Sequence, residues 1–161
     1  MEKGQLFALE VARELTALQF QFQWLFVGDG PEKEHCINKA VELGLSDCCR
    51  FIGTRENPYP YIKHADIYVQ SSHVEADPVT IQEALVLFKP IVASDIPAMR
   101  ETLQNGKLGV LCEFSPEVFA KEIQKVYMVA AIQRSLIDNI RRTDNRSSDS
   151  EYLLRKHLGL L

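Results

Sequence analysis

Two carboxylates with a predicted helix start between them are the side chains in this chain best placed to do chemistry. Glu75 and Glu83 are separated by seven residues. Between them, Asp77 is a favourable helix N-cap, and Pro78 suits the first helical position because its fixed φ matches the helix. With Glu75 on the approach loop and Glu83 inside the helix, the two carboxylates should lie roughly 10–15 Å apart. That separation fits the two ends of one polar ligand.

The start of this helix predicts what would occupy the space between the two carboxylates. The amides of Val79 and Thr80 are expected to point out of the helix N-terminus, where unpaired donors and the helix dipole favour a phosphate. The simpler alternative is that Glu83 is an ordinary exposed helical glutamate. The apolar run around it favours a mostly buried helix, in which a carboxylate needs a partner. The pattern therefore predicts a ligand that is polyhydroxylated at both ends and anionic in the middle.

Composition limits the function classes. The chain has 161 residues, enough for one domain, and a net charge of −4 without a long basic stripe, which argues against nucleic acid as a partner. Its four cysteines lack zinc-ligand spacing, so we expect reduced, structural thiols, a cytoplasmic location and no metal. No apolar run approaches the roughly 18 residues of a membrane-spanning helix.

Short apolar runs alternate with helical patterns along the chain, which is typical of repeated βα units and predicts an α/β, Rossmann-like parallel sheet flanked by helices. The expected strands are residues 22–27, 50–52, 67–70, 91–93 and 108–111, and the expected helices are 3–17, 32–43, 58–64, 78–88, 97–103 and a final one after Ser115-Pro116.

The end of the chain has a different character. Residues 1–140 form the predicted domain, residues 141–150 are polar and are interpreted as a linker, and residues 151–161 form a short amphipathic tail. We expect the tail to dock on the domain or on a neighbouring one, and a membrane-surface role is the less favoured alternative.

Several polar turns follow the predicted strands. Gly28 and Gly30 form a glycine turn without the third glycine of a dinucleotide fingerprint, so NAD binding is not expected. Ligands bind beyond the carboxyl ends of parallel strands, where this turn and three others are predicted to converge: Gly53-Thr54-Arg55, Ser71-Ser72-His73 and Ser94-Asp95. His73 is a candidate ligand contact, although a hydrogen-bonded bystander is the commoner role. Lys3 and Arg55 could supply positive charge to a diphosphate, or could be solvated surface charges.

The order of these segments resembles the C-terminal, donor-binding half of a GT-B glycosyltransferase, specifically glycosyltransferase family 4. The resemblance runs through most of the chain. It is carried by Glu2-Lys3-Gly4, Val27-Gly28-Asp29-Gly30-Pro31, Phe51-Ile52-Gly53, Ala65-Asp66-Ile67-Tyr68-Val69 leading to Ser71-Ser72, the segment from Glu75 to Ala84, Lys89-Pro90-Ile91-Val92-Ala93-Ser94-Asp95, Glu101 and Asn105-Gly106 to Leu111.

The resemblance implies a retaining transfer of a sugar from a nucleotide-diphosphate donor to an acceptor hydroxyl, with no cofactor and no obligatory metal. It assigns Glu83 to the ribose hydroxyls and Glu75, the candidate catalytic residue, to the donor sugar. It also implies that main-chain amides near Asp77, Val79 and Thr80 face the phosphates, that Lys3 neutralises the diphosphate, and that Gly53 and Thr54 contact the base.

The chain also departs from the family pattern. Ala76-Asp77 stands where the family usually has Gly-Phe or Gly-Leu. The family's central first strand, ahead of Lys3, and its N-terminal acceptor domain are both absent from the sequence, so we expect an unpaired gap or rearranged pairing in the sheet, and weak donor binding with little transfer by this fragment alone. Membrane association is expected only through the parent protein, in a bacterial polysaccharide, lipopolysaccharide or glycoprotein pathway. The alternatives are a GT-B-type nucleotide-sugar epimerase or phosphorylase and a non-catalytic α/β interaction module.

Overall fold

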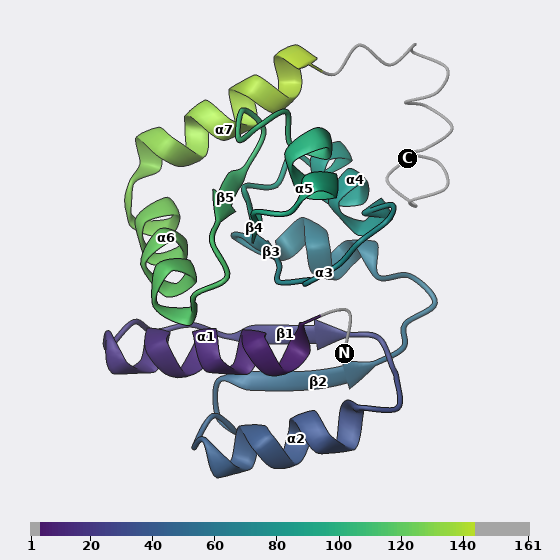
Figure 1. Ribbon diagram of the computed structural model, residues 1–161, viewed down its shortest axis with the longest axis vertical. Coiled ribbons are helices and arrows are strands. Elements are labelled where there is room, and N and C mark those ends of the chain that lie inside the picture. The colour runs from purple at the N-terminus through teal and green to yellow at the C-terminus, as the bar shows by residue number, and fades with distance from the viewer. Residues whose placement is uncertain (1–3, 144–161) are drawn as a thin grey trace.

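The computed structural model describes residues 4–143, in which helices and parallel strands alternate (Figure 1). The elements are α1 Gln5–Ala17, β1 Trp24–Val27, α2 Lys33–Glu42, β2 Cys49–Gly53, α3 Tyr59–His64, β3 Tyr68–Gln70, α4 Val79–Val86, β4 Ile91–Ser94, α5 Pro97–Thr102, β5 Val110–Cys112, α6 Pro116–Met128 and α7 Ala130–Thr143. The predicted α/β class and parallel strand pairing are confirmed. Among the described helices, none has the length and apolar character needed to cross a bilayer.

The strands form two separate sheets rather than one. β1 pairs with β2, and β4 lies between β3 and β5. No pairing joins β1 to β3 within residues 4–143, so each of these strands has one unpaired edge. The expectation of a gap in the sheet is thereby confirmed.

Helix α1 ties the two sheets together through two hydrophobic clusters. Its Val11 and Leu15 are buried with Phe119 of α6, in the cluster that reaches the three-stranded sheet. Its Leu9 is buried with Cys36 of α2, in the cluster over the two-stranded sheet. Because the sheets share no strand pairing, these apolar contacts carry much of the connection between them.

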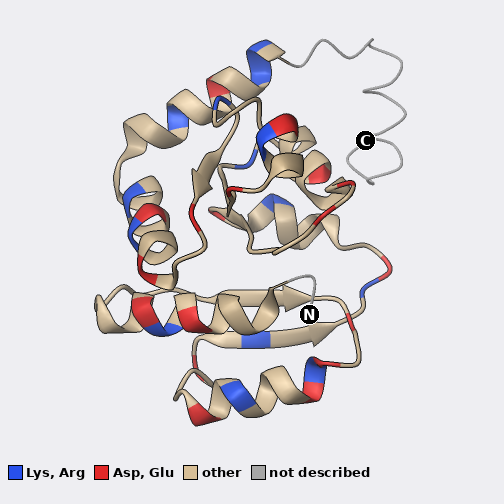
Figure 2. Ribbon diagram, in the orientation of Figure 1, with Lys and Arg blue, Asp and Glu red and all other residues tan. Residues whose placement is uncertain are grey.

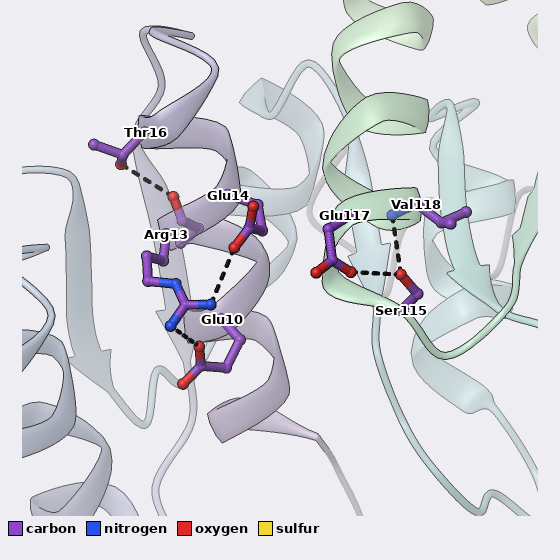
Figure 3. Close-up of polar contacts among 8 residues, drawn as sticks. Glu10, Arg13, Glu14, Thr16, Ser115, Glu117 and Val118 are labelled. Atoms are coloured by element: carbon purple, nitrogen blue, oxygen red, sulfur yellow. Dashed lines mark hydrogen bonds and ion pairs between the residues drawn. The ribbon is translucent and has the colours of Figure 1, made fainter.

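The start of α6 follows the predicted pattern. The Val118 amide donates to Ser115 Oγ at 3.3 Å, and the Ser115 hydroxyl donates to Glu117 Oε2 at 2.7 Å. Ser115 is therefore the N-cap, as its sequence position predicts. Figure 3 shows this cap beside α1, where Arg13 bridges two glutamates of its own helix.

Two predicted helix boundaries are wrong. α4 begins at Val79, and the capping position is Pro78, whose ψ of 64° is not helical. Asp77 makes no capping bond, because its Oδ1 accepts from Gln82 Nε2 at 3.0 Å and its carbonyl accepts from the Val79 amide at 2.9 Å. The single final helix is in fact two, α6 and α7, since the chain leaves helical geometry at Val129.

The predicted linker begins too early. α7 continues to Thr143, so residues 141–143 are helical instead of linker. Residues 144–150 of the predicted linker, the amphipathic tail at 151–161 and Lys3 lie outside the described residues.

Candidate functional site

A cavity of about 700 Å³ lies between the two sheets, near the carboxyl ends of β1, β2 and β3. Five of the predicted site residues line it: Gly28, Gly30, Thr54, Thr80 and Glu83. Arg55 and Ser71, from two of the turns predicted to converge, line it as well. This volume includes the gap between the unpaired edges of β1 and β3. The cavity is bounded by the unpaired strands themselves, since residues of both β1 and β3 contribute to its wall.

Glu83 faces this cavity and has the partner that its position predicts. The Tyr59 hydroxyl donates to Glu83 Oε1 at 3.2 Å. The pKa of Tyr59 is raised, first by burial and then by the charge of Glu83. Tyr59 therefore orients one carboxylate oxygen of Glu83, and a carboxylate has further lone pairs that can accept from hydroxyl groups of a ligand.

Glu75 is held from β3 and the turn that follows it. Its Oε2 accepts from Ser72 Oγ at 3.2 Å and lies 3.5 Å from Gln70 Nε2. Glu75 is not among the residues that line the cavity, although Gln70 is. Glu75 is therefore joined to the cavity wall through its contact with Gln70.

Tyr68 links the two carboxylates electrostatically. Burial is the main cause that raises its pKa; a hydrogen bond with Thr80 lowers it, and the charges of Glu83 and Glu75 both raise it. The Tyr68 hydroxyl donates to Gln70 Oε1 at 3.0 Å, and Gln70 Nε2 lies 3.5 Å from Glu75 Oε2. Tyr68, Gln70, Thr80 and Glu83 all line the cavity, so Glu75 is joined through Gln70 to the wall that carries Glu83.

The glycine turn after β1 is held against the end of β2. The Gly28 amide donates to the Gly53 carbonyl at 2.9 Å, and Gly28 has φ of 122°, which favours glycine. Lys33 forms an ion pair with Asp29 at 3.2 Å. Arg55 makes no ion pair within residues 4–143, so it is a cation of the cavity wall whose charge is available to an anion.

Other predicted site residues lie outside the wall of this cavity. His73 is exposed and packs its ring on Phe114, with centroids 3.7 Å apart. Gly53, Asp77 and Val79 are also absent from the wall, as are Ser94 and Asp95. His73 is therefore placed as part of an aromatic contact, and the structure does not bring it to the cavity.

Gly4 fixes the start of α1 against the end of β3. Ser71 Oγ donates to the Gly4 carbonyl at 3.1 Å, and a Cβ on Gly4 would stand 1.8 Å from the Ser71 carbonyl oxygen. Only glycine fits this contact at its φ of 67°. Lys3 precedes Gly4 in the chain and is not described, so its predicted role stays a prediction.

Sequence reasoning missed Tyr59, Tyr68 and Gln70 as parts of the site. Gln70 carried a signal, because a polar residue ends an otherwise apolar strand and must find hydrogen bonds if that strand is buried. Neither Tyr59 nor Tyr68 carried such a signal in the sequence, because the pattern around each is that of an ordinary apolar packing residue.

Positive charge is not gathered at the cavity. Figure 2 shows Lys and Arg scattered over helices and strands of the described chain, interspersed with Asp and Glu. Besides Lys33 and Arg55, the described cavity wall carries three acidic residues, Asp29, Glu32 and Glu83. Such a wall suits a ligand with both hydroxyl groups and a localised negative charge.

Comparison with known proteins identifies the family. The family model of glycosyl transferases group 1 matches residues 1–143. The chain belongs to this family. Its parallel α/β architecture is that of a GT-B glycosyltransferase half, which confirms the fold that the resemblance implied.

Two curated relatives show the range of the family. An uncharacterized glycosyltransferase of Methanocaldococcus jannaschii is 30% identical over 111 residues, which are 69% of this chain and 26% of the relative. The lipopolysaccharide core biosynthesis glycosyltransferase LpsE of Rhizobium meliloti is 25% identical over 87% of this chain and 41% of its own. This group 1 chain therefore spans less than half the length of these relatives.

Solved structures match nearly the whole chain. TarM of S. aureus, solved as a mutant with UDP and other ligands, superposes with a TM-score of 0.84 at 18% identity over 98% of this chain and 33% of TarM. Anabaena HepE in complex with UDP and glucose superposes with a TM-score of 0.78 at 20% identity over 99% of this chain and 45% of HepE. At these identities the likeness establishes the fold.

Proposed function

We propose that this chain is the donor-binding half of a retaining glycosyltransferase, of family 4 within group 1, that moves a sugar from a nucleotide-diphosphate-sugar to an acceptor hydroxyl. The observation that carries the proposal is the cavity between the sheets, whose wall combines Gly28 and Gly30, Thr54 and the α4 residues Thr80 and Glu83. Structural neighbours that contain UDP, including HepE with UDP and glucose, support this choice of ligand.

The two carboxylates take different ends of the donor. Glu83 lines the cavity and accepts hydrogen bonds from the ribose hydroxyls, while Tyr59 fixes its orientation. Glu75 holds the hydroxyls of the donor sugar once the ligand extends toward Ser72. Gly53 and Thr54 contact the base.

The diphosphate lies at the start of α4. The Val79 amide already donates to the Asp77 carbonyl, whereas the Thr80 amide donates to no backbone carbonyl among residues 4–143. Thr80 is therefore the best-placed amide donor of the three residues predicted to face the phosphates. Val79 and Asp77 reach the phosphates only if this turn rearranges on binding.

Stabilisation of the departing diphosphate lowers the barrier to transfer. Arg55 supplies charge from the cavity wall, and Lys3 supplies it from the segment before α1. Lys33 contributes less, because Asp29 already neutralises it at 3.2 Å. With amides and side-chain cations in this role, the reaction proceeds without a metal ion.

The acceptor is bound by a second domain of the parent protein, which is cytoplasmic and reaches a membrane only through its other parts. The relative LpsE acts in lipopolysaccharide core biosynthesis. We propose a related class of pathway, the assembly of a polysaccharide, lipopolysaccharide or glycoprotein glycan.

Calorimetry with the 161-residue chain tests the proposal. UDP, GDP, UDP-glucose and GDP-mannose are titrated into the wild type and into Glu83→Ala. Since a hydrogen bond to a charged group contributes about 1.5–3 kcal/mol, we expect Glu83→Ala to weaken the binding of nucleotide and nucleotide-sugar alike by about 10- to 100-fold. Glu42→Ala, an exposed helical glutamate on α2, is the matched control and should bind as the wild type does.

A second variant separates the ends of the ligand. Glu75→Ala should weaken the nucleotide-sugar more than the free nucleotide. Equal loss for both ligands contradicts the assignment of Glu75 to the sugar. Absence of binding by the wild type, together with stable oligomers, would favour the interaction module instead.

A further inference from the structure

The carboxyl end of β3 carries a buried polar cluster that the roles above leave unexplained. Gln70 is 7% exposed and Ser72 is fully buried. Burying an amide and a hydroxyl costs free energy unless both find hydrogen bonds, so a cluster of this kind persists where its geometry is satisfied.

Gln70 is the junction of the cluster. Its Nε2 donates to Ser72 Oγ at 2.8 Å and lies 3.5 Å from Glu75 Oε2. Its Oε1 accepts from the Tyr68 hydroxyl at 3.0 Å and from Thr80 Oγ1 at 3.4 Å. One amide therefore joins the β3 strand, the loop that carries Glu75 and the first turn of α4.

The chemistry of the partners fixes the orientation of this amide. An ionised carboxylate only accepts hydrogen bonds, so the nitrogen of Gln70 must face Glu75 and the oxygen must face Tyr68 and Thr80. A reversed amide would set two acceptors against each other. The position of Glu75 is thus tied, through a buried group with one allowed orientation, to that of Thr80.

We propose that Gln70 is a positioning residue for donor binding, which holds the Glu75 carboxylate and the start of α4 in register so that the sugar and the diphosphate are bound together. This inference rests on the proposed function, in which Glu75 meets the sugar and Thr80 the phosphates. Its specific consequence is that Gln70 matters most for ligands that span both ends.

Two variants test the inference. Gln70→Leu removes both halves of the junction and keeps an apolar side chain in the strand. It should weaken a nucleotide-sugar such as UDP-glucose by about tenfold or more, the loss expected for a hydrogen bond to a charged group, and weaken UDP by less than about threefold. Calorimetry on the 161-residue chain gives both constants, and circular dichroism confirms that the variant is folded.

Gln70→Glu supplies a readout that a merely structural role would not move. This change keeps the side-chain shape but sets a second carboxylate beside Glu75, and two neighbouring carboxylates raise each other's tendency to hold a proton. When the introduced carboxyl is protonated it can donate to Glu75 again. We therefore expect the affinity of this variant for UDP-glucose to recover as the pH is lowered from 8 toward 5, while Gln70→Leu stays weak across the range. Gln133→Glu makes the same chemical change at a half-buried residue of α7, whose Nε2 donates to the Tyr127 carbonyl at 3.2 Å and which does not line the cavity, and it should match the wild type throughout.

The outcomes separate the two proposals. If the wild type binds neither nucleotides nor nucleotide-sugars even at millimolar ligand, where weak binding by this chain would still be detected, the proposed function fails and this inference fails with it. If the wild type binds and both Gln70 variants lose UDP and UDP-glucose in equal proportion, with no pH-dependent recovery, the donor site stands and the positioning role of Gln70 is overturned. Should Gln70→Leu fail to fold, the pH profile of Gln70→Glu alone decides.

Discussion

The two sheets of the molecule are buried to different degrees, although each contains a strand of mostly apolar residues, β1 in one and β4 in the other. In the three-stranded sheet, all four residues of β4 are buried between β3 and β5. In the two-stranded sheet, β1 is wholly apolar, yet its Leu25 and Val27 remain 43% and 39% exposed. A strand that is apolar on both faces is typical of the interior of a parallel sheet, so β1 has the sequence of a central strand and the surroundings of an edge.

This difference in burial indicates which part of the candidate site is more firmly supported by the core. The polar cluster around Gln70 grows from β3, on the well-packed side, whereas the glycine turn and Thr54 belong to the two-stranded side. The proposed sugar and phosphate contacts therefore have a rigid support, and the proposed base contacts depend on how firmly α1 holds the smaller sheet.

The largest expected contrast is in core truncation. Ile91→Ala removes a side chain with 0% exposure and should lower the free energy of unfolding by about 2–5 kcal/mol. Leu25→Ala should cost less than about 1.5 kcal/mol, because that side chain is already 43% exposed and little apolar area is returned to water. Urea denaturation measures both, and equal losses would mean that β1 is packed as tightly as β4.

Gly4→Ala tests the joint between the two sides. The added Cβ would meet the Ser71 carbonyl at 1.8 Å and require a positive φ. Backbone strain of this kind costs on the order of 1–3 kcal/mol, and displacement of α1 adds to it. We expect a lower urea midpoint and weaker nucleotide binding in the same variant. Gly44→Ala is the control, since it shares a positive φ but has open space around it. An equal loss of stability in both variants would show that the close contact of Gly4 with Ser71 adds nothing beyond the cost of a positive φ.

Thiol reactivity is a third way to compare the two sheets, and the expected difference is smaller. Burial is the main cause that raises the pKa of Cys49, in β2, to about 12 and the pKa of Cys112, in β5, to about 12. Both thiols are therefore neutral and unreactive at pH 8 unless the structure opens. We expect Cys49 to be alkylated faster than Cys112 in the native chain, by peptide mapping, because the two-stranded side should open more readily. Faster alkylation of Cys112 would contradict this expectation and indicate that the three-stranded sheet opens more readily.

The smallest expected effect is electrostatic. The Arg100 guanidinium, whose Nη2 donates to Asp95 Oδ2 at 2.8 Å, holds the pKa of Asp95 below its usual value. A lowered pKa gives stability above the unfolded-state pKa of about 3.9, which is lost as the pH falls through the folded-state pKa. Arg100→Gln should thus lower the urea midpoint slightly at pH 7, and the difference should vanish toward pH 2. A difference that grows on acidification would contradict the sign of this shift.

The sequence predicted the order and type of elements well, because alternating apolar runs and helical patterns reflect burial in a parallel sheet. It failed where local geometry overrode the pattern. Asp77 was expected to cap α4, but the turn through Pro78 sends its side chain to Gln82. No glycine or proline directly precedes Val129 at the end of α6, so the sequence pattern did not predict that the helix ends there.

Of the residues predicted for the candidate site, the ones that line the cavity lie in the turns after β1 and β2 and in the first two turns of α4. Glu83, Thr80, Thr54 and the glycine turn all reach one cavity. The sequence could not predict that His73 would turn away to pack on Phe114, since either orientation fits the same loop sequence. Nor could it join Gln70 to Glu75, because that contact depends on how the loop after β3 folds back.

The most direct test of the whole account is an amide chemical-shift titration of the 161-residue chain with UDP-glucose. We expect the amides of Gly28 and Thr54 on the two-stranded side and of Thr80 at the start of α4 to shift together with a single saturation curve. Shifts confined to one side of the cavity, or none at these three residues, would contradict the claim that one donor is bound between the two sheets.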